Sequence, residues 1–176
     1  REVGEYLPPH PGADKFGFPG STAAGRRVRA ICGEMLKRCT LELGGKSAAI
    51  ILEDADLAAA VPLLMPSALM NNGEACIAQT RILAPRSRYA EVVDAVAEAV
   101  RGHKVGDPTD PTVAVGPLVA ERQRDRVLGY IDKGRSEGAT VTVGGGRPAG
   151  LDKGWFVEPT LFADVDNGMR IAREEI

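Results

Sequence analysis

The chain has 176 residues, of which 44% are hydrophobic and 5% aromatic, and its 22 Lys and Arg nearly balance 24 Asp and Glu, giving a net charge of −2. This hydrophobic content is enough for a packed core and argues against disorder. The near-neutral charge and the few aromatic rings argue against nucleic-acid binding, and no apolar run reaches the roughly 18 residues of a membrane span.

The N-terminal part alternates strand-like and helix-like segments. The pattern predicts a short strand at Lys15–Phe18, a helix at about Thr22–Lys37 and an extended segment at Thr40–Leu43. Ser47–Leu52 is a continuous apolar run, which is typical of a strand buried on both faces.

The rest of the chain continues this alternation. Leu57–Asn71 is predicted as a helix capped by Asp54 or Asp56, with a kink or break at Pro66 because proline cannot donate a backbone hydrogen bond. The remaining segments are strands at Arg81–Ala84 and Thr140–Val143, helices at Tyr89–Val100 and Ala120–Gly134, a loop at Gly106–Pro117, an extended segment at Trp155–Phe162, and the start of a helix at the terminal Arg-Glu-Glu-Ile176. Strands alternating with helices indicate an α/β fold with a largely parallel sheet.

Two glycine-rich stretches are candidate phosphate sites. Gly20-Ser-Thr-Ala-Ala-Gly25 follows a predicted strand and opens a helix, where free backbone N–H groups suit a phosphate, although a helix cap with close packing explains it as well. Gly144-x-Gly146-x-x-Ala149 matches a relaxed dinucleotide pattern, but Pro148 and Gly150 exclude the helix that should follow. The second stretch is therefore predicted to be a connecting turn.

The cysteines and histidines predict no metal site. Cys32, Cys39 and Cys76 are odd in number and lack C-x-x-C spacing, which argues against both disulfides and zinc, and neither histidine has a ligand-like neighbour. The absence of a secretory leader pattern agrees with a reduced, cytoplasmic protein.

Cys76 and Glu42 are the residues with catalytic potential. Cys76 lies between a helix end and a strand, where a thiol can be exposed and activated, although a free cysteine is more often a small buried hydrophobe. Glu42 ends an apolar strand before two glycines, and a carboxylate there is costly unless it is paired or functional. A cysteine nucleophile needs a base for hydrolysis, and Glu42 could be that base.

Three stretches together resemble the NAD(P)-dependent aldehyde dehydrogenases: Phe18-Pro-Gly-Ser-Thr-Ala-Ala-Gly25, Leu41-Glu-Leu-Gly-Gly-Lys46 and Asn72-Gly-Glu-Ala-Cys76. Gly116-Pro-Leu118, Gly154-Trp-Phe-Val-Glu-Pro-Thr160 and Ala172-Arg-Glu-Glu-Ile176 also fit the family. The resemblance implies an aldehyde-dehydrogenase-like fold, with residues 1–42 as the end of a Rossmann-like NAD(P)-binding domain. Residues 43–176 would be a catalytic domain that is incomplete at its C-terminus.

The resemblance also implies the chemistry. Cys76 would attack the aldehyde to form a thiohemiacetal, hydride transfer to NAD or NADP would leave a thioester, and water activated by Glu42 would release the carboxylic acid. It further implies cofactor contacts for a set of residues, namely Gly20 and Ser21 at the pyrophosphate, Ala24 near the adenine, Gly25 in the same helix start, Leu43 near the nicotinamide and Glu175 at its ribose. The partners would be a small-molecule aldehyde and, in the full-length protein, a second copy in a dimer or tetramer.

The sequence departs from the family pattern at Pro19, where a threonine is usual, and at Pro66. Family members are also nearly three times as long, so we expect the isolated segment to oxidise no aldehyde. Three other functions remain open. An acylating dehydrogenase that uses coenzyme A would typically lack the Glu42 base, a degenerate domain with a binding role is favoured by the two prolines, and a Cys–His hydrolase lacks a suitably placed histidine.

Overall fold

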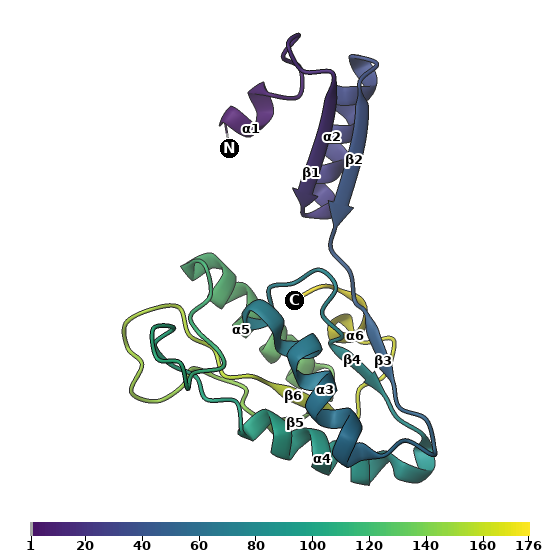
Figure 1. Cartoon of the computed structure of the whole chain (residues 1–176), viewed down its shortest axis with the longest axis vertical. Coiled ribbons are helices and arrows are strands. Elements are labelled where there is room, and N and C mark those ends of the chain that lie inside the picture. Colours follow the sequence, from purple (N-terminus) through teal and green to yellow (C-terminus); the bar gives the residue numbers. More distant parts are fainter. Residues whose placement is uncertain (1) are drawn as a thin grey trace. The chain divides into compact units, whose positions relative to one another are not determined.

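The computed structural model describes residues 2–176. The chain forms two compact units, the first extending to Gly45 and the second running from Lys46 to Ile176. Both units mix helices with short strands, as the alternating sequence pattern predicts (Figure 1).

The first unit is built on a β-α-β arrangement. It contains α1 (Glu2–Tyr6), β1 (Lys15–Gly20), α2 (Thr22–Glu34) and β2 (Arg38–Leu43). β1 and β2 pair in parallel, from Lys15 opposite Arg38 to Gly20 opposite Leu43, and α2 lies along this pair (Figure 1). The helix buries Gly25, Val28, Ile31 and Cys32, whose spacing of three and four residues places them on one helix face.

α2 ends at Glu34, three residues before the predicted end. The N–H of Lys37 donates to the carbonyl of Cys32 at 2.8 Å, and that of Leu36 donates to Gly33 at 3.1 Å. Leu36 has φ = 53°, so these bonds form a Schellman motif around a left-handed residue. Glycine usually occupies that position. Because a leucine stands there, the sequence contained no signal that the helix ends at this point.

The second unit contains the remaining elements. In chain order these are β3 (Ala48–Ile50), α3 (Leu57–Leu69), the 3₁₀ helix η1 (Met70–Gly73), β4 (Arg81–Leu83), the 3₁₀ helix η2 (Arg86–Arg88), α4 (Tyr89–Arg101), α5 (Glu121–Ser136), β5 (Thr140–Val143), β6 (Leu161–Ala163) and α6 (Arg170–Arg173). β3 and β4 pair in parallel, whereas β5 and β6 pair antiparallel. The expectation of a largely parallel sheet therefore holds for two of the three strand pairs in residues 2–176.

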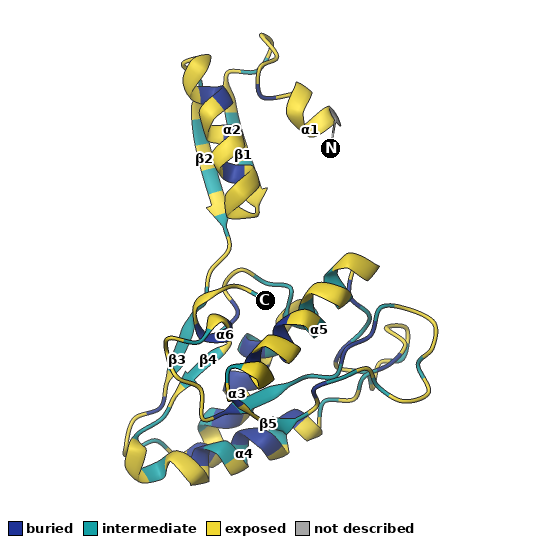
Figure 2. Ribbon diagram, turned by 180° about the vertical axis from the view of Figure 1, so that it is seen from behind, coloured by how far each residue is buried: buried dark blue, intermediate teal, exposed yellow. Residues whose placement is uncertain are grey.

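The main core of the second unit lies between α3 and α4. It contains Ile51 and a row of α3 side chains that meet a stripe of valines on α4. Figure 2 shows buried positions along both helices in dark blue. These are Leu57, Val61, Leu64, Met65 and Ala68 from α3, and Val92, Val96 and Val100 from α4. The helical spacing of Val92, Val93, Val96 and Val100 predicts an apolar face on this helix. The structure confirms burial for three of them, whereas Val93 is half-buried.

The apolar run Ser47–Leu52 is buried on one face, although burial on both faces was expected. Ala49 and Ile51 face the core, but Ile50 and Leu52 are 67% and 63% exposed. In the described part of the chain β3 pairs with β4 alone, and one of its faces packs against helices, so alternate side chains point away from the core. The prediction of burial on both faces is wrong for this chain.

Of the kink or break predicted at Pro66, the break does not occur, because α3 continues through both Pro62 and Pro66 to Leu69. The two prolines are four residues apart on the exposed face. The carbonyls of Ala58 and Pro62, which lose their helical donors there, therefore lie on the side that water can reach. The opposite face holds the helix in place through its core contacts.

Two C-terminal predictions need correction. Trp155–Phe162 forms a strand only from Leu161, and its earlier part makes isolated backbone bonds such as Leu118 N–H to Trp155 at 3.0 Å. Arg170–Arg173 forms a short helix that ends before Glu174, which is extended with φ = −109° and ψ = 148°, so no helix starts at the terminal residues. The Gly144–Gly146 stretch is part of the β5–β6 connection, as predicted. Within the described residues, we find no helix that is both long and apolar enough to cross a membrane.

Candidate active site

The predicted phosphate site lies where β1 passes into α2. Ser21 caps α2, because its Oγ accepts the N–H of Ala24 at 3.3 Å. The first two N–H groups of the helix, at Thr22 and Ala23, have no acceptor within the helix itself. A Cβ at position 20 would lie 2.7 Å from the Phe18 ring, so glycine is required there and leaves the backbone without a side chain. The cap and the free donors occur together, which gives this end of α2 the chemistry of an anion site.

Gly25 and Leu43 are brought together inside the first unit. A Cβ on Gly25 would lie 2.6 Å from Cδ2 of Leu43, so the absence of a side chain lets α2 approach the end of β2. The N–H of Gly25 already donates to the Ser21 carbonyl at 2.9 Å. Close packing is therefore the role that Gly25 has in this geometry, and it holds Leu43 beside the first turn of α2.

Glu42 lies at the C-terminal end of β2, opposite Pro19 of β1. Its side chain is exposed, whereas Leu41 and Leu43 on either side are half-buried, as the alternation of a strand requires. Both strands end at this edge, with Gly20 opposite Leu43. In open α/β sheets ligands bind at the carboxyl ends of the strands, so Glu42 and the start of α2 share the expected location.

Cys76 lies in the loop that links α3 to β4. It follows Ala75 in a turn closed by the N–H of Ala78 donating to the Ala75 carbonyl at 3.0 Å. Its side chain is exposed, unlike that of Cys32, which is 1% exposed and whose thiol pKa is raised by burial and by the neighbouring Cys39. The interpretation of Cys76 as a small buried hydrophobe does not fit this position, so the thiol is accessible for chemistry.

Two residues with positive φ shape the start of this loop. Asn71 and Asn72 have φ of 49° and 58°, in the left-handed region that asparagine tolerates better than most residues. The side-chain amide of Asn72 accepts the N–H of Gly116 at 2.7 Å and donates to the carbonyl of Pro117 at 3.3 Å. Sequence reasoning missed this role, although Asn-Asn-Gly is a typical signal for left-handed turns.

Glu175 lies in the segment after α6, which is held against α5. Arg126 of α5 donates to the backbone carbonyl of Glu175 at 2.8 Å, and the Tyr130 hydroxyl donates to the adjacent Glu174 at 2.6 Å. Arg170 also donates to Glu174, and both hydrogen bonds hold the pKa of that carboxyl below its usual range. Sequence reasoning did not single out Arg126 or Tyr130.

Lys46 ends one of the stretches that resemble the family, but the sequence predicted no role for it. It lies in the second unit, where the charge of Glu175 acts on it. Burial, together with the nearby charge of Arg81, lowers the pKa of its ammonium group to about 8, although the carboxylate of Glu175 opposes this shift. Arg81 donates to the Lys46 backbone carbonyl at 2.9 Å. A lysine with this pKa is partly neutral near physiological pH, which distinguishes it from ordinary surface lysines.

The candidate residues thus fall into two groups. The first unit holds Gly20, Ser21, Ala24, Gly25, Glu42 and Leu43 around one edge of its strand pair, and the second holds Cys76 and Glu175. The first group has the donors and the open backbone of an anion site. The second group has an accessible thiol.

Comparison with known proteins assigns the family. The model of the aldehyde dehydrogenase family matches residues 1–176. A geranial dehydrogenase of Castellaniella defragrans is 56% identical over 176 residues, which is all of this chain and 36% of the relative. The chain therefore spans about a third of the length of the relatives it matches.

Solved structures agree with this assignment. An aldehyde dehydrogenase of Mycobacterium tuberculosis complexed with NAD⁺ is 59% identical, with a TM-score of 0.97 over 99% of this chain and 36% of that chain. A mutant of aldehyde dehydrogenase C from Pseudomonas syringae, complexed with NAD⁺ and octanal, is 42% identical, with a TM-score of 0.95 over 98% of this chain and 36% of that one. Together with the family match, these similarities show that the chain belongs to the aldehyde dehydrogenase family.

Proposed function

We propose that this chain is the part of an NAD(P)-dependent aldehyde dehydrogenase that supplies the nucleophile Cys76 and the general base Glu42. The reaction is the oxidation of an aldehyde to a carboxylic acid. The observation that carries the proposal is the accessible Cys76 thiol in the Ala75–Ala78 turn of a chain that belongs to this family.

The first step is attack of the Cys76 thiolate on the carbonyl carbon of the aldehyde. A carbon–sulfur bond forms, and the carbonyl π electrons move to oxygen to give the oxyanion of a thiohemiacetal. Among the residues that the structure describes, the N–H of Cys76 has no hydrogen-bond acceptor. This N–H is free to donate to the oxyanion, and a preorganised donor of this kind contributes about 3 kcal/mol of transition-state stabilisation.

Bound NAD⁺ or NADP⁺ supplies the acceptor for the hydride that leaves the thiohemiacetal carbon, after which an acyl thioester remains on Cys76. The residues of this chain that fit the cofactor are those of the α2 start. The free N–H groups after Gly20 and Ser21 suit its pyrophosphate, Ala24 is exposed on the first turn, and Leu43 packs beside Gly25. Glu175 would accept hydrogen bonds from the nicotinamide ribose hydroxyls.

Glu42 completes the reaction by hydrolysis. Its exposed carboxylate would take a proton from water, the resulting oxygen nucleophile would attack the thioester carbon, and the carboxylic acid would leave as the Cys76 thiolate is released. A carboxylate at the carboxyl edge of a strand pair favours hydrolysis over acyl transfer to coenzyme A. Pro66 gives little support to a degenerate domain, because α3 continues through it.

The partners we infer are a small-molecule aldehyde and, for the full-length protein, further copies in a dimer or tetramer. Geranial and octanal, which the names of two relatives mention, are suitable probe substrates. The free thiols Cys32, Cys39 and Cys76 favour a reducing, cytoplasmic location.

The test compares variants of the full-length protein in stopped-flow measurements of NADH formation. Cys76→Ser should show no burst of NADH with either probe aldehyde. Glu42→Gln should keep a burst of about one NADH per subunit, while its steady-state rate falls about 100-fold or more because the thioester is no longer hydrolysed. The matched control is Glu98→Gln, which removes an exposed carboxylate from α4 whose ion pair in the described part of the chain is with Arg101.

Full steady-state turnover by Glu42→Gln would contradict the role of Glu42, and turnover by Cys76→Ser would contradict that of Cys76. If acyl-coenzyme A were the main product when coenzyme A is present, the enzyme would be an acylating dehydrogenase instead.

A further inference from the structure

The loop that carries Cys76 makes few backbone hydrogen bonds to the rest of the second unit, and its buried residue, Ala78, follows the thiol. Between Met70 and Thr80 most backbone bonds are local, such as Glu74 to Asn71 and Ala78 to Ala75. Outside helices and strands, the backbone bond of the described residues that leaves the loop runs from the Gln79 N–H to the Ser67 carbonyl of α3 at 3.2 Å. This bond lies on the C-terminal side of Cys76, so it does not fix the segment that leads into the thiol.

The N-terminal side of the loop is fixed by the side chain of Asn72. Its Oδ1 accepts from the Gly116 N–H at 2.7 Å and its Nδ2 donates to the Pro117 carbonyl at 3.3 Å, across 44 and 45 residues of sequence. The amide uses both its donor and its acceptor on consecutive backbone groups, as a strand neighbour would. The residue is half-buried, which shields both hydrogen bonds from exchange with water.

The segment to which Asn72 is hydrogen-bonded, Gly116–Pro117, is itself well fixed. The N–H of Gly106 donates to the Val115 carbonyl at 3.0 Å, and the N–H of Val115 donates to Lys104 at 3.1 Å. Val115 and Leu118, which flank Gly116 and Pro117, are 6% and 8% exposed and so are held in place by burial. The Asn72 amide therefore attaches the nucleophile loop to a rigid partner.

We propose that Asn72 is a positioning residue that fixes the Cys76 thiol and its backbone N–H for attack on the aldehyde. This inference rests on the proposed role of Cys76 as the nucleophile. Asn72 combines a left-handed backbone at φ = 58° with a side-chain amide that both donates and accepts a hydrogen bond. No other side chain of its length provides both the donor and the acceptor. Misplacement of a reacting group by about 1 Å costs on the order of 100-fold in rate, so loss of these hydrogen bonds should slow acylation.

The experiment uses Asn72→Gly in the full-length enzyme, because glycine adopts the left-handed backbone without strain and removes only the side chain. The rate constant of the NADH burst and kcat should fall about 10- to 100-fold, with KM for octanal changed less than threefold. Asn72→Asp keeps the acceptor for the Gly116 N–H and loses the donor to Pro117, so it should recover part of the burst rate. A purely structural role would instead lower the melting temperature and leave the burst rate of the folded enzyme unchanged.

The matched control is Asp164→Gly. Asp164 has φ = 56° and its carboxylate accepts from the Thr140 hydroxyl at 3.1 Å, so the change also removes a long-range side-chain bond at a left-handed position but does not touch residues 70–80. It should keep the wild-type burst rate. A wild-type burst rate in Asn72→Gly, with Cys76→Ser inactive, would overturn the role of Asn72 and leave the proposed function standing. Activity in Cys76→Ser would overturn the proposed function itself.

Discussion

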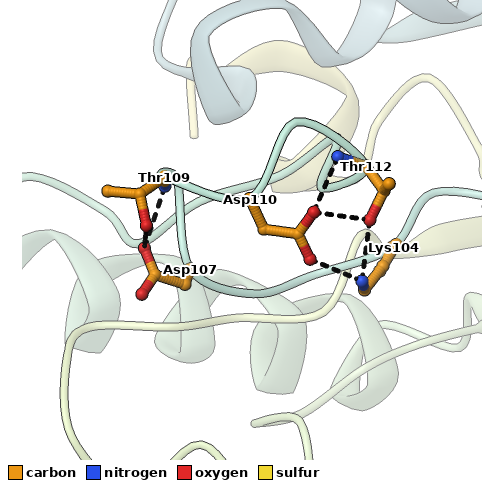
Figure 3. Close-up of polar contacts among 5 residues, drawn as sticks. All are labelled: Lys104, Asp107, Thr109, Asp110 and Thr112. Carbon is orange, nitrogen blue, oxygen red and sulfur yellow. Dashed lines mark hydrogen bonds and ion pairs between the residues drawn. The ribbon is translucent and has the colours of Figure 1, made fainter.

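At the scale of single residues, the loop before α5 contains the motif Asp-Pro-Thr twice, and both copies form the same hydrogen bonds. In the sequence Asp107-Pro-Thr109-Asp110-Pro-Thr112, each aspartate accepts both the N–H and the hydroxyl of the threonine two residues later (Figure 3). Lys104 adds an ion pair to Asp110 at 2.8 Å. These bonds favour the carboxylate forms and hold the pKa of both aspartates below the usual value, that of Asp110 more strongly.

This geometry predicts a pH dependence for Asp110. Because its folded pKa is lower than that of the unfolded chain, its contribution to stability is complete above about pH 4 and is lost as the pH falls toward the folded pKa. Asp110→Asn should therefore lower the melting temperature at pH 7 and make it less sensitive to acid between pH 5 and pH 2. Thermal melts across this range, monitored by circular dichroism, measure both effects. An equal acid sensitivity in variant and wild type would contradict this prediction.

Residue-scale sequence reasoning identified candidate residues but not the groups that hold them. Cys76 and Glu42 stand out through their neighbours in sequence, and both prove to be exposed. Asn72 reaches Gly116 across 44 residues, and Arg126 reaches Glu175 across 49. Such contacts depend on how the loops fold back, which local composition does not encode.

At the scale of elements, helix and strand periodicity located nearly all segments, and their ends depended on local chemistry. β5 and α4 match the predicted ranges to within one residue because their apolar spacing is regular. α2 was predicted to end three residues too late because a leucine occupies its left-handed cap. α3 was predicted to kink or break at Pro66, and it does not break; the pattern did not reveal that both prolines lie on its exposed face.

The α2 cap gives a direct test of this explanation. Leu36 is 95% exposed, so its side chain contributes little packing, while its left-handed backbone is unfavourable for any residue with a Cβ. Leu36→Gly should raise the free energy of unfolding by about 1 kcal/mol. Urea denaturation of wild type and variant measures this difference. A matched change at exposed Met35, which is not left-handed, should not stabilise the protein, and a destabilised Leu36→Gly would contradict the assignment of the cap.

At the scale of the whole molecule, the candidate residues are divided between two compact units. Glu42 and the start of α2 belong to the first unit, and Cys76 and Glu175 belong to the second. The chain matches about 36% of the length of its relatives. Several apolar side chains of the second unit, including Ile50, Leu52 and Leu63, are more than 60% exposed.

These observations lead us to expect no aldehyde oxidation from the 176-residue chain alone. Expressed by itself, it should form no NADH with geranial or octanal above the rate of its Cys76→Ser variant, in a spectrophotometric assay at 340 nm. The full-length protein under the same conditions is the positive control. Turnover by the isolated chain that disappears in Cys76→Ser would contradict the expectation.

The central claim, that Cys76 is the nucleophile and Glu42 releases its acyl group, is tested most directly by mass spectrometry of the Glu42→Gln full-length enzyme. The enzyme is quenched in acid after reaction with octanal and NAD⁺ and then digested. The account predicts an octanoyl group on the peptide that contains Cys76, which should be absent without NAD⁺ and absent from the double variant that also carries Cys76→Ser. An acyl group on a different residue, or none at all while NADH is still released, would contradict it.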